Sequence, residues 1–264
     1  MQAAATVSAL RVGSTPALRA EGLVKRFGAR RVLEGVALEV AAGAAVGLVG
    51  VNGAGKTTFI KCALDLCDFD AGSVEIFGVP SREAAARARL AYVPERFQPP
   101  YYLLGREFLE MTLALAGARF ELARALALAA ELELEPQALE RPVRQLSKGM
   151  TQKLGLAGCF LLERDLYVID EPMSGLDPAG RVVVKSVLAR LNRSGRALFF
   201  TSHVLSDVEE LCSTIAVLDR GTVRFHGAPA ELCARYGGQS LERAFLSCIR
   251  TEARSDGDHA AVRA

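Results

Sequence analysis

The stretch GVNGAGKTT, residues 50–58, contains residue types suited to binding phosphate. Its spacing fits the pattern G-x-x-x-x-G-K-[ST] from Gly50 to Thr57. Glycines let the backbone wrap closely around an anion, so that N–H groups and a helix N-terminus face it. Lys56 would add a positive charge, and Thr57 would supply a hydroxyl for Mg²⁺. We therefore predict a nucleotide site formed by Gly50, Asn52, Gly53, Ala54, Gly55, Lys56, Thr57 and Thr58.

The segments on either side decide between this site and an ordinary glycine-rich turn with an incidental lysine. AAVGLVG, residues 44–50, is a short apolar run typical of a buried strand, and KTTFIKCALDL, residues 56–66, begins a helical pattern. A strand before the motif and a helix after it form the context that phosphate binding requires. The sequence therefore favours the phosphate site.

A second candidate group follows the apolar strand LYVID, residues 166–170. Asp170 could hold Mg²⁺ through water, and Glu171 could accept a proton from an attacking water molecule. Two adjacent carboxylates after a strand can also be helix caps or solvated turn residues. The phosphate motif upstream favours hydrolysis, with Glu171 as the general base and Asp170 at the metal.

His203 ends a third apolar stretch, RALFFTSH, residues 196–203. It could donate a hydrogen bond to a γ-phosphate or orient the attacking water. A single histidine after a strand is more often a structural residue. The phosphate motif and the acidic pair are the reason for placing His203 in the site.

These motifs lie at the ends of strands that alternate with helical patterns. Residues 90–95, LAYVPE, form a further strand pattern, and residues 178–192 read as a helix with Pro178 in its first turn. Alternating strands and helices predict a parallel sheet covered on both faces. Functional sites in such sheets lie at the carboxyl ends of the strands.

Two other segments break the alternation. Residues 105–135 have apolar residues at helical spacing and no strand signal, which predicts a helical insert. Residues 214–227 read as two strands around a turn at Gly221, and two short amphipathic helices are predicted over residues 229–237 and 241–249.

Composition narrows the function classes. The chain has 264 residues and a net charge of +2, so one compact unit is expected and a nucleic-acid partner is disfavoured. The six cysteines include no CxxC pair, which favours reduced thiols over a metal site. No secretion signal and no uncharged apolar run long enough to span a membrane are evident.

The order of four motifs adds a family resemblance. The phosphate motif, LSKGM (146–150), YVIDEPMSGLDP (167–178) and TSH (201–203) together resemble the ATP-binding subunits of ABC transporters, over about Glu21 to Ile249. The resemblance implies an α/β fold, with a P-loop NTPase parallel-sheet core, an antiparallel β subdomain and a helical subdomain. It divides the chain into a flexible tail (1–19), an ATPase core (20–94 and 165–226), a helical subdomain with the signature loop (95–164), C-terminal helices (227–250) and a second flexible tail (251–264).

In this family two ATP-binding domains pair head to tail, and each ATP lies between the P-loop of one domain and the signature loop of the other. The resemblance therefore assigns Ser147, Lys148 and Gly149 to the ATP of a partner. It places Asp177 in the D-loop at the dimer interface. Phe27 occupies the position where an aromatic ring stacks on adenine.

Each of these residues also has a simpler interpretation. Phe27 could face the core, since aromatic rings are common in strands. Ser147 and Asp177 could cap the helices that follow them, and capping is compatible with the functional role. No Glu or Gln stands three residues after Ser147, so no reciprocal capping box is expected there.

The sequence departs from the family at two positions. Glu95 stands where the Q-loop glutamine is usual, and its carboxylate could still face Mg²⁺ although it lacks the amide donor. Gln98 is the alternative through a shift of register, and we favour Glu95. The second departure is Lys148, whose charge could lie near a phosphate or contact the partner subunit.

The resemblance implies an ATPase that uses ATP and Mg²⁺ to power transport through an integral membrane permease. Details of LSKGM, Glu95 and the C-terminal helices favour the exporter-like bacterial branch, for drugs, lipids, polysaccharide or related cargo. We expect a homodimer of ATP-binding domains, peripheral on the cytoplasmic side of the inner membrane and in contact with the membrane only through the permease. The alternatives are a soluble ABC-type ATPase that takes no part in transport, and a P-loop kinase or GTPase in which the signature stretch and His203 would be accidental.

Overall fold

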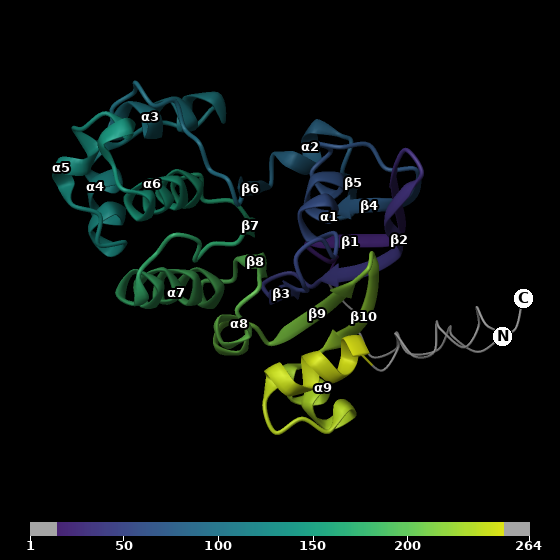
Figure 1. Cartoon of the computed structure of the whole chain (residues 1–264). Coiled ribbons are helices and arrows are strands. Elements are labelled where there is room, and N and C mark those ends of the chain that lie inside the picture. The colour runs from purple at the N-terminus through teal and green to yellow at the C-terminus, as the bar shows by residue number, and fades with distance from the viewer. Residues whose placement is uncertain (1–14, 251–264) are drawn as a thin grey trace, which may run out of the picture.

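The computed structural model describes residues 15–250, which form two β-sheets and the helices around them (Figure 1). The two predicted end segments fall largely outside this range, since residues 1–14 and 251–264 are not described. One boundary is wrong, because the first strand, β1, begins at Leu18, inside the segment 1–19 that was expected to be a tail. Leu18 is fully buried and pairs with Val40. Ala17 is also fully buried, so the core already includes residues from before the predicted boundary.

The larger sheet has six strands in the order β10-β9-β3-β8-β7-β6. Its strands are β3 (Ala45–Val49), β6 (Leu90–Val93), β7 (Leu166–Asp170), β8 (Ala197–Ser202), β9 (Thr214–Asp219) and β10 (Thr222–Gly227). The five strands from β9 to β6 are parallel, and β10 is an antiparallel edge strand. The predicted parallel sheet and the predicted pair of strands around Gly221 are both confirmed.

Strand β7 shows why these segments read as continuous apolar runs. Leu166 and Val168 belong to the hydrophobic cluster on one face of the sheet, whereas Tyr167 and Ile169 belong to the cluster on the other face. Successive side chains of a strand point to opposite faces, so a sheet covered on both sides requires an apolar residue at every position.

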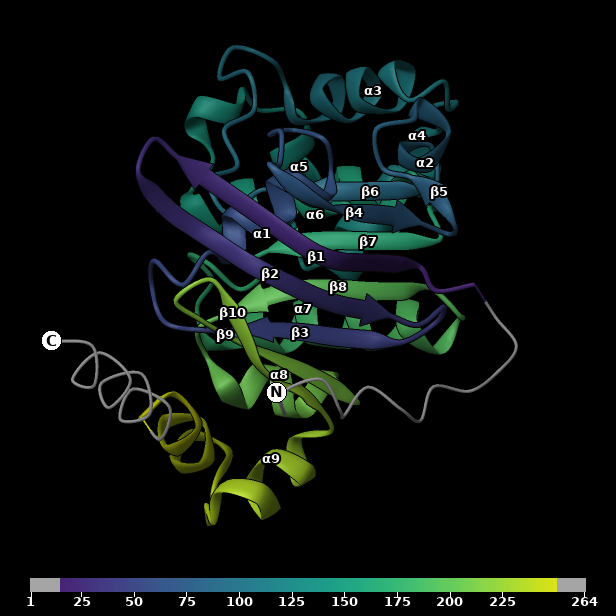
Figure 2. The ribbon, with the colours of Figure 1, turned by 90° about the vertical axis from the view of Figure 1, so that its right-hand side faces the viewer.

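The smaller sheet is antiparallel, with strand order β2-β1-β4-β5. It comprises β1 (Leu18–Phe27), β2 (Arg30–Val40), β4 (Ala71–Ile76) and β5 (Val79–Pro80). Helix α1 (Lys56–Ala63) buries Phe59 and Ile60 in the cluster that this sheet shares with the larger one. Figure 2 shows the antiparallel strands in front of the parallel sheet.

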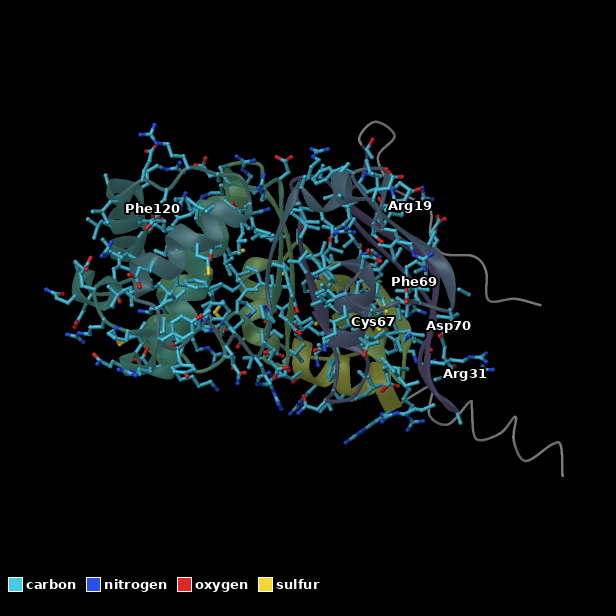
Figure 3. The ribbon with its side chains drawn as sticks, turned by 90° about the horizontal axis from the view of Figure 1, so that it is seen from above. Arg19, Arg31, Cys67, Phe69, Asp70 and Phe120 are labelled. Atoms are coloured by element: carbon cyan, nitrogen blue, oxygen red, sulfur yellow. The ribbon has the colours of Figure 1, made fainter. Side chains whose placement is uncertain are left out.

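The remaining helices lie mainly on the opposite face of the larger sheet. They are α2 (Ala84–Arg87), α3 (Gly105–Leu115), α4 (Leu122–Glu131), α5 (Pro136–Leu139), η1 (Val143–Gln145), α6 (Lys148–Leu161), α7 (Pro178–Arg193), α8 (Leu205–Leu211) and α9 (Pro229–Tyr236), and residues 241–250 are also helical. Helices α3 and α4 form the helical insert predicted over residues 105–135, and α5 and α6 follow it within the range 95–164 expected for the helical subdomain. In the view from above, Phe120 lies in this helical part, and Arg19 and Asp70 lie at the other end of the molecule (Figure 3).

Strand order brings the predicted motifs together. Strand β8 lies between β3 and β7, with Val49 paired to Ser202 and Asp170 paired to Thr201. All three strands run in the same direction, so their carboxyl ends meet at one edge of the sheet. The phosphate motif, the acidic pair and His203 follow these three ends.

The six cysteines are free thiols, four of them buried. Within residues 15–250, none of the helices combines the length and the apolar character needed to cross a membrane.

We predict that Phe199→Ala lowers the free energy of unfolding by about 3–5 kcal/mol, measured by urea denaturation. Phe199 is fully buried in β8, and its ring centroid lies 5.8 Å from that of Phe59 in α1, so the change leaves a cavity where the helix packs on the sheet. The control is Leu115→Ala, because Leu115 is 82% exposed and its loss should change stability by less than about 0.5 kcal/mol. Equal effects of the two changes would contradict this assignment of the core.

Candidate functional site

A pocket of about 560 Å³ opens at the carboxyl edge of the parallel sheet. It is lined by Phe27, Arg30, Val32, Asn52, Gly53, Gly55, Lys56, Thr57, Thr58, Glu95, Asp170, Glu171 and His203. The lining residues come from both sheets, from the loop before α1 and from the loops after β6, β7 and β8. The structure thus brings most of the predicted site residues into one concave surface.

The phosphate motif forms the loop between β3 and α1. Gly53 and Gly55 have φ values of 82° and 112°, in the left-handed region that glycine adopts without strain. Gly50 and Ala54, which we had also predicted as ligands, do not line the pocket. A Cβ on Gly50 would lie 2.3 Å from the Leu218 carbonyl oxygen, and Ala54 is buried in the core, so these two residues hold the loop in place.

Lys56 lies at the first position of α1 and is only 8% exposed. Its ammonium donates hydrogen bonds to the carbonyl oxygen of Gly50 at 2.7 Å and to that of Val51 at 3.4 Å. Burial lowers the pKa of Lys56 from its usual 10.5, and the negative charge of Glu171 and of the other pocket carboxylates opposes that shift. A desolvated cation beside a helix N-terminus is suited to binding an anion.

Asp170 ends β7 and is 1% exposed. The Thr57 hydroxyl donates to its Oδ2 at 2.8 Å, and the Thr201 hydroxyl donates to its Oδ1. Asp170 and Thr57, which were both predicted to hold a metal, are therefore hydrogen-bonded to each other. Thr201 belongs to the TSH motif, but no site role was predicted for it from the sequence.

Glu171 follows with a φ of 55°, which is uncommon for a residue other than glycine. Its Oε2 lies 2.8 Å from Nδ1 of His203, and its side chain is 10% exposed whereas that of His203 is 63% exposed. Strained backbone conformations of this kind are concentrated at functional sites. The distance of 2.8 Å pairs Glu171, the predicted base, with His203.

Glu95 follows β6 and lines the pocket, whereas Gln98 does not, which favours Glu95 at the Q-loop position. Within residues 15–250, no three His, Cys, Asp or Glu side chains are grouped closely enough to form a metal site by themselves. Mg²⁺ at nucleotide sites typically takes one or two protein oxygens, and phosphates and water supply the rest. The oxygens of Thr57 and Asp170, 2.8 Å apart, fit that requirement.

Phe27, at the end of β1, is 53% exposed and lines the pocket, so the alternative that it faces the core is wrong. The Lys25 ammonium lies 4.8 Å from its ring centroid. Arg30 and Val32 of β2 line the pocket beside it and were missed. The basic run KRFGARR around Phe27 was the available signal for Arg30.

Two loops assigned to a dimer interface do not line this pocket. Ser147 caps α6, since its Oγ accepts a hydrogen bond from the N–H of Met150 at 3.2 Å. Asp177 caps α7 in the same way, and its Oδ1 accepts from the N–H of Gly180 at 2.7 Å. The capping interpretation is confirmed for both residues, and no reciprocal capping box is present at Ser147.

Lys148 lies against the loop that precedes Asp177. A Cβ atom on Gly175 would come within 2.7–2.8 Å of the Cγ, Cδ and Cε atoms of Lys148. A Cβ on Gly149 would lie 3.2 Å from the Gly175 carbonyl oxygen. Within one chain, the aliphatic part of Lys148 thus packs on the SGLD loop, residues 174–177.

Comparisons with known proteins show similarity to ATP-binding proteins of ABC transporters. The family model for ABC transporters matches residues 33–174. An uncharacterized ABC transporter ATP-binding protein of Synechocystis sp. is 36% identical over 79% of this chain, and the match spans only 60% of that relative's own length. The Nod factor export ATP-binding protein I of Ralstonia nicotianae is also 36% identical, over 91% of this chain and 77% of that protein. A solved structure of an ATP-binding subunit of an ABC transporter is 31% identical, with a TM-score of 0.78 over 88% of this chain and 99% of that one.

We predict that the affinity for ATP falls as the pH rises toward 10.5, the usual pKa of lysine. The pKa of Lys56 is lowered in the free protein, and bound phosphate would raise it again. At a pH where Lys56 of the free protein is partly deprotonated, ATP binding therefore takes up a proton, which weakens the affinity as the pH rises. The measurement is ATP affinity across the alkaline range by equilibrium dialysis. Lys56→Arg is the control, because arginine stays charged and its weaker binding should be nearly independent of pH. The same alkaline loss in both proteins would contradict the assignment.

We predict that Gly175→Ala lowers the free energy of unfolding by about 1–2 kcal/mol from backbone strain alone, because its φ is 76°. The new Cβ atom would also clash with the Lys148 side chain, which should lower the stability further. In a double-mutant cycle with Lys148→Gly, the double variant should be more stable than the sum of the single effects predicts, by about 0.5 kcal/mol or more. Additive effects in urea denaturation would show that Lys148 does not pack on Gly175 in solution.

Proposed function

This chain belongs to the ATP-binding proteins of the ABC transporter family, and on that premise we propose that it hydrolyses ATP to drive transport through a membrane-spanning partner. The observation that carries the proposal is the convergence of Lys56, Asp170 and the Glu171–His203 pair on one pocket. Phosphoryl transfer to water requires a cation, metal-binding oxygens and a general base, and these residues would supply all three.

Lys56 and the loop before α1 would hold the phosphates of ATP. The ammonium exchanges its carbonyl partners, Gly50 and Val51, for phosphate oxygens that carry full negative charge. The N–H groups at the start of α1 face the same anion. At the other end of the pocket, the exposed ring of Phe27 would stack on adenine, with Arg30 beside it.

Glu171 would act as the general base. It accepts a proton as a water oxygen attacks the γ-phosphorus, and the bond from that phosphorus to the bridging oxygen of ADP breaks. The Nδ1 of His203 lies 2.8 Å from Oε2 of Glu171, and as an imidazolium, which has two N–H donors, His203 would also donate a hydrogen bond to the γ-phosphate. Glu95 would lie near the metal and the attacking water, from its place in the pocket lining.

Thr57 and Asp170 would hold Mg²⁺, with Glu95 nearby. The ion would neutralise charge that develops on the β- and γ-phosphate oxygens. The hydrogen bond between the Thr57 hydroxyl and Asp170 supports this proposal, because it places the two oxygens 2.8 Å apart in the pocket that Lys56 also lines.

The active site would be completed by a second copy of the chain. Ser147, Lys148, Gly149 and Asp177 lie outside the pocket of their own chain, which supports a role at the ATP of a partner. The N-terminus of α6, capped by Ser147, offers N–H groups to the γ-phosphate of that ATP.

The partner in the membrane would be an integral permease, and the chain would sit on the cytoplasmic face of the inner membrane through that contact. Helices α3 to α6 would carry the contact. The Ralstonia relative is named for Nod factor export, which supports the proposal that this chain serves an exporter. Drugs, lipids, polysaccharide or related cargo are the proposed substrates. The alternative, a soluble ATPase outside transport, gains no support from relatives that are named as transporter subunits.

We predict that Glu171→Gln lowers the steady-state rate of ATP hydrolysis by about 100-fold or more and leaves ATP binding intact, because the amide cannot accept the proton. Phosphate release by the full-length chain and binding of a fluorescent ATP analogue are the measurements. Glu110→Gln is the control, since Glu110 is an exposed carboxylate on α3. Near-normal hydrolysis by Glu171→Gln would refute the role of Glu171.

A further inference from the structure

We propose that Thr201 is a positioning residue for this reaction, because its one hydroxyl fixes both members of the acidic pair. Its Oγ1 donates a hydrogen bond to Oδ1 of Asp170 at 2.5 Å and accepts one from the backbone N–H of Glu171 at 2.9 Å. The inference rests on the proposed ATP hydrolysis and adds a residue to it. Thr201 does not line the pocket, so it acts through its two neighbours.

The hydroxyl of Thr201 has a defined orientation. A threonine has one O–H to donate, and here it is directed to Asp170, so the lone pairs are left to accept from Glu171. The side chain is fully buried, which leaves it out of reach of bulk water. Its β-branched side chain also restricts rotation about χ1. Thr201 is therefore suited to holding two groups in a fixed relation.

The Asp170 carboxylate is held at both oxygens. Thr57 donates to Oδ2 and Thr201 donates to Oδ1, so the plane of the carboxylate is fixed from β8 and from α1. Thr57 is the hydroxyl that we propose for Mg²⁺, which makes its bond to Asp170 exchangeable. Thr201 does not line the pocket and would not bind Mg²⁺. Its hydrogen bond to Oδ1 therefore keeps the Asp170 carboxylate oriented when the Thr57 hydroxyl turns to the metal.

Glu171 is also held at two points from the end of β8. Thr201 accepts from its backbone N–H, and His203 lies 2.8 Å from its Oε2. The backbone of Glu171 has a φ of 55°, a conformation that persists only when surrounding contacts fix it. Thr201 supplies the contact to the main chain, and His203 supplies the contact to the side chain.

The test compares Thr201→Val, which keeps the shape and removes the hydroxyl, with Thr201→Ser, which restores the hydroxyl. The measurements on the full-length chain are kcat and KM for ATP, the Mg²⁺ concentration for half-maximal hydrolysis, and the binding of a fluorescent ATP analogue in EDTA. Thr112→Val is the matched control, because the Thr112 hydroxyl donates a hydrogen bond to the Phe108 carbonyl, within α3.

For Thr201→Val we expect kcat to fall by about 10–100-fold and the Mg²⁺ requirement to rise by about 10-fold, as for other residues that orient metal ligands. Metal-free binding should stay within about twofold, because Lys56 and the loop before α1 are unchanged. Thr201→Ser should recover most of the kcat and of the Mg²⁺ response. A merely structural role would not change the Mg²⁺ response selectively.

Unchanged kcat and Mg²⁺ dependence in Thr201→Val would overturn the proposal. If that variant does not fold, Thr201→Cys, which is close in size and a weaker hydrogen-bond partner, takes its place, and parent-like Mg²⁺ dependence there would overturn it equally. Failure of the proposed function is distinguishable, because it appears as absent hydrolysis in the parent chain or as normal hydrolysis in Glu171→Gln.

Discussion

The site depends on the packing of β8 between β3 and β7. Because the three parallel strands are buried on both faces, their order and register are fixed by side-chain packing in the apolar clusters on either side. The register pairs Asp170 with Thr201 and Val49 with Ser202, so the phosphate loop, the acidic pair and His203 emerge at one edge. A slip by one residue would exchange the two faces of a strand and separate these groups.

The charges at this edge are balanced within the pocket. Lys56 lacks bulk solvation and bonds two carbonyl oxygens of its own loop, while the pocket carboxylates favour its charged form. Asp170 receives two hydroxyl donors, and Glu171 lies beside His203. Lys56, Asp170 and Glu171 therefore each have a partner in the nucleotide-free structure, which keeps these side chains near the positions that binding requires.

The LSKGM loop is held in place by contacts outside the pocket. Its serine satisfies the helix N-terminus and its lysine stem packs on Gly175, so the loop is held to the segment that leads into α7. The two loops contact each other, and neither lines the pocket. A change in one of them would be transmitted to the other by direct contact.

Local spacing in the sequence determined the chemical groups: the phosphate motif, the Asp170–Glu171 pair, the histidine, and the strands and helices that carry them. These features are encoded by neighbouring residues, whose patterns report backbone conformation and burial. The start of strand β1 was placed too late, because only three residues, Leu18 to Ala20, alternate before Glu21 and Gly22 interrupt the pattern. Only the tertiary structure decided that Thr201 bonds Asp170, that Arg30 reaches the pocket and that Lys148 packs on Gly175. Such contacts join residues far apart along the chain, and they are set by strand order, register and loop packing, which no local pattern records.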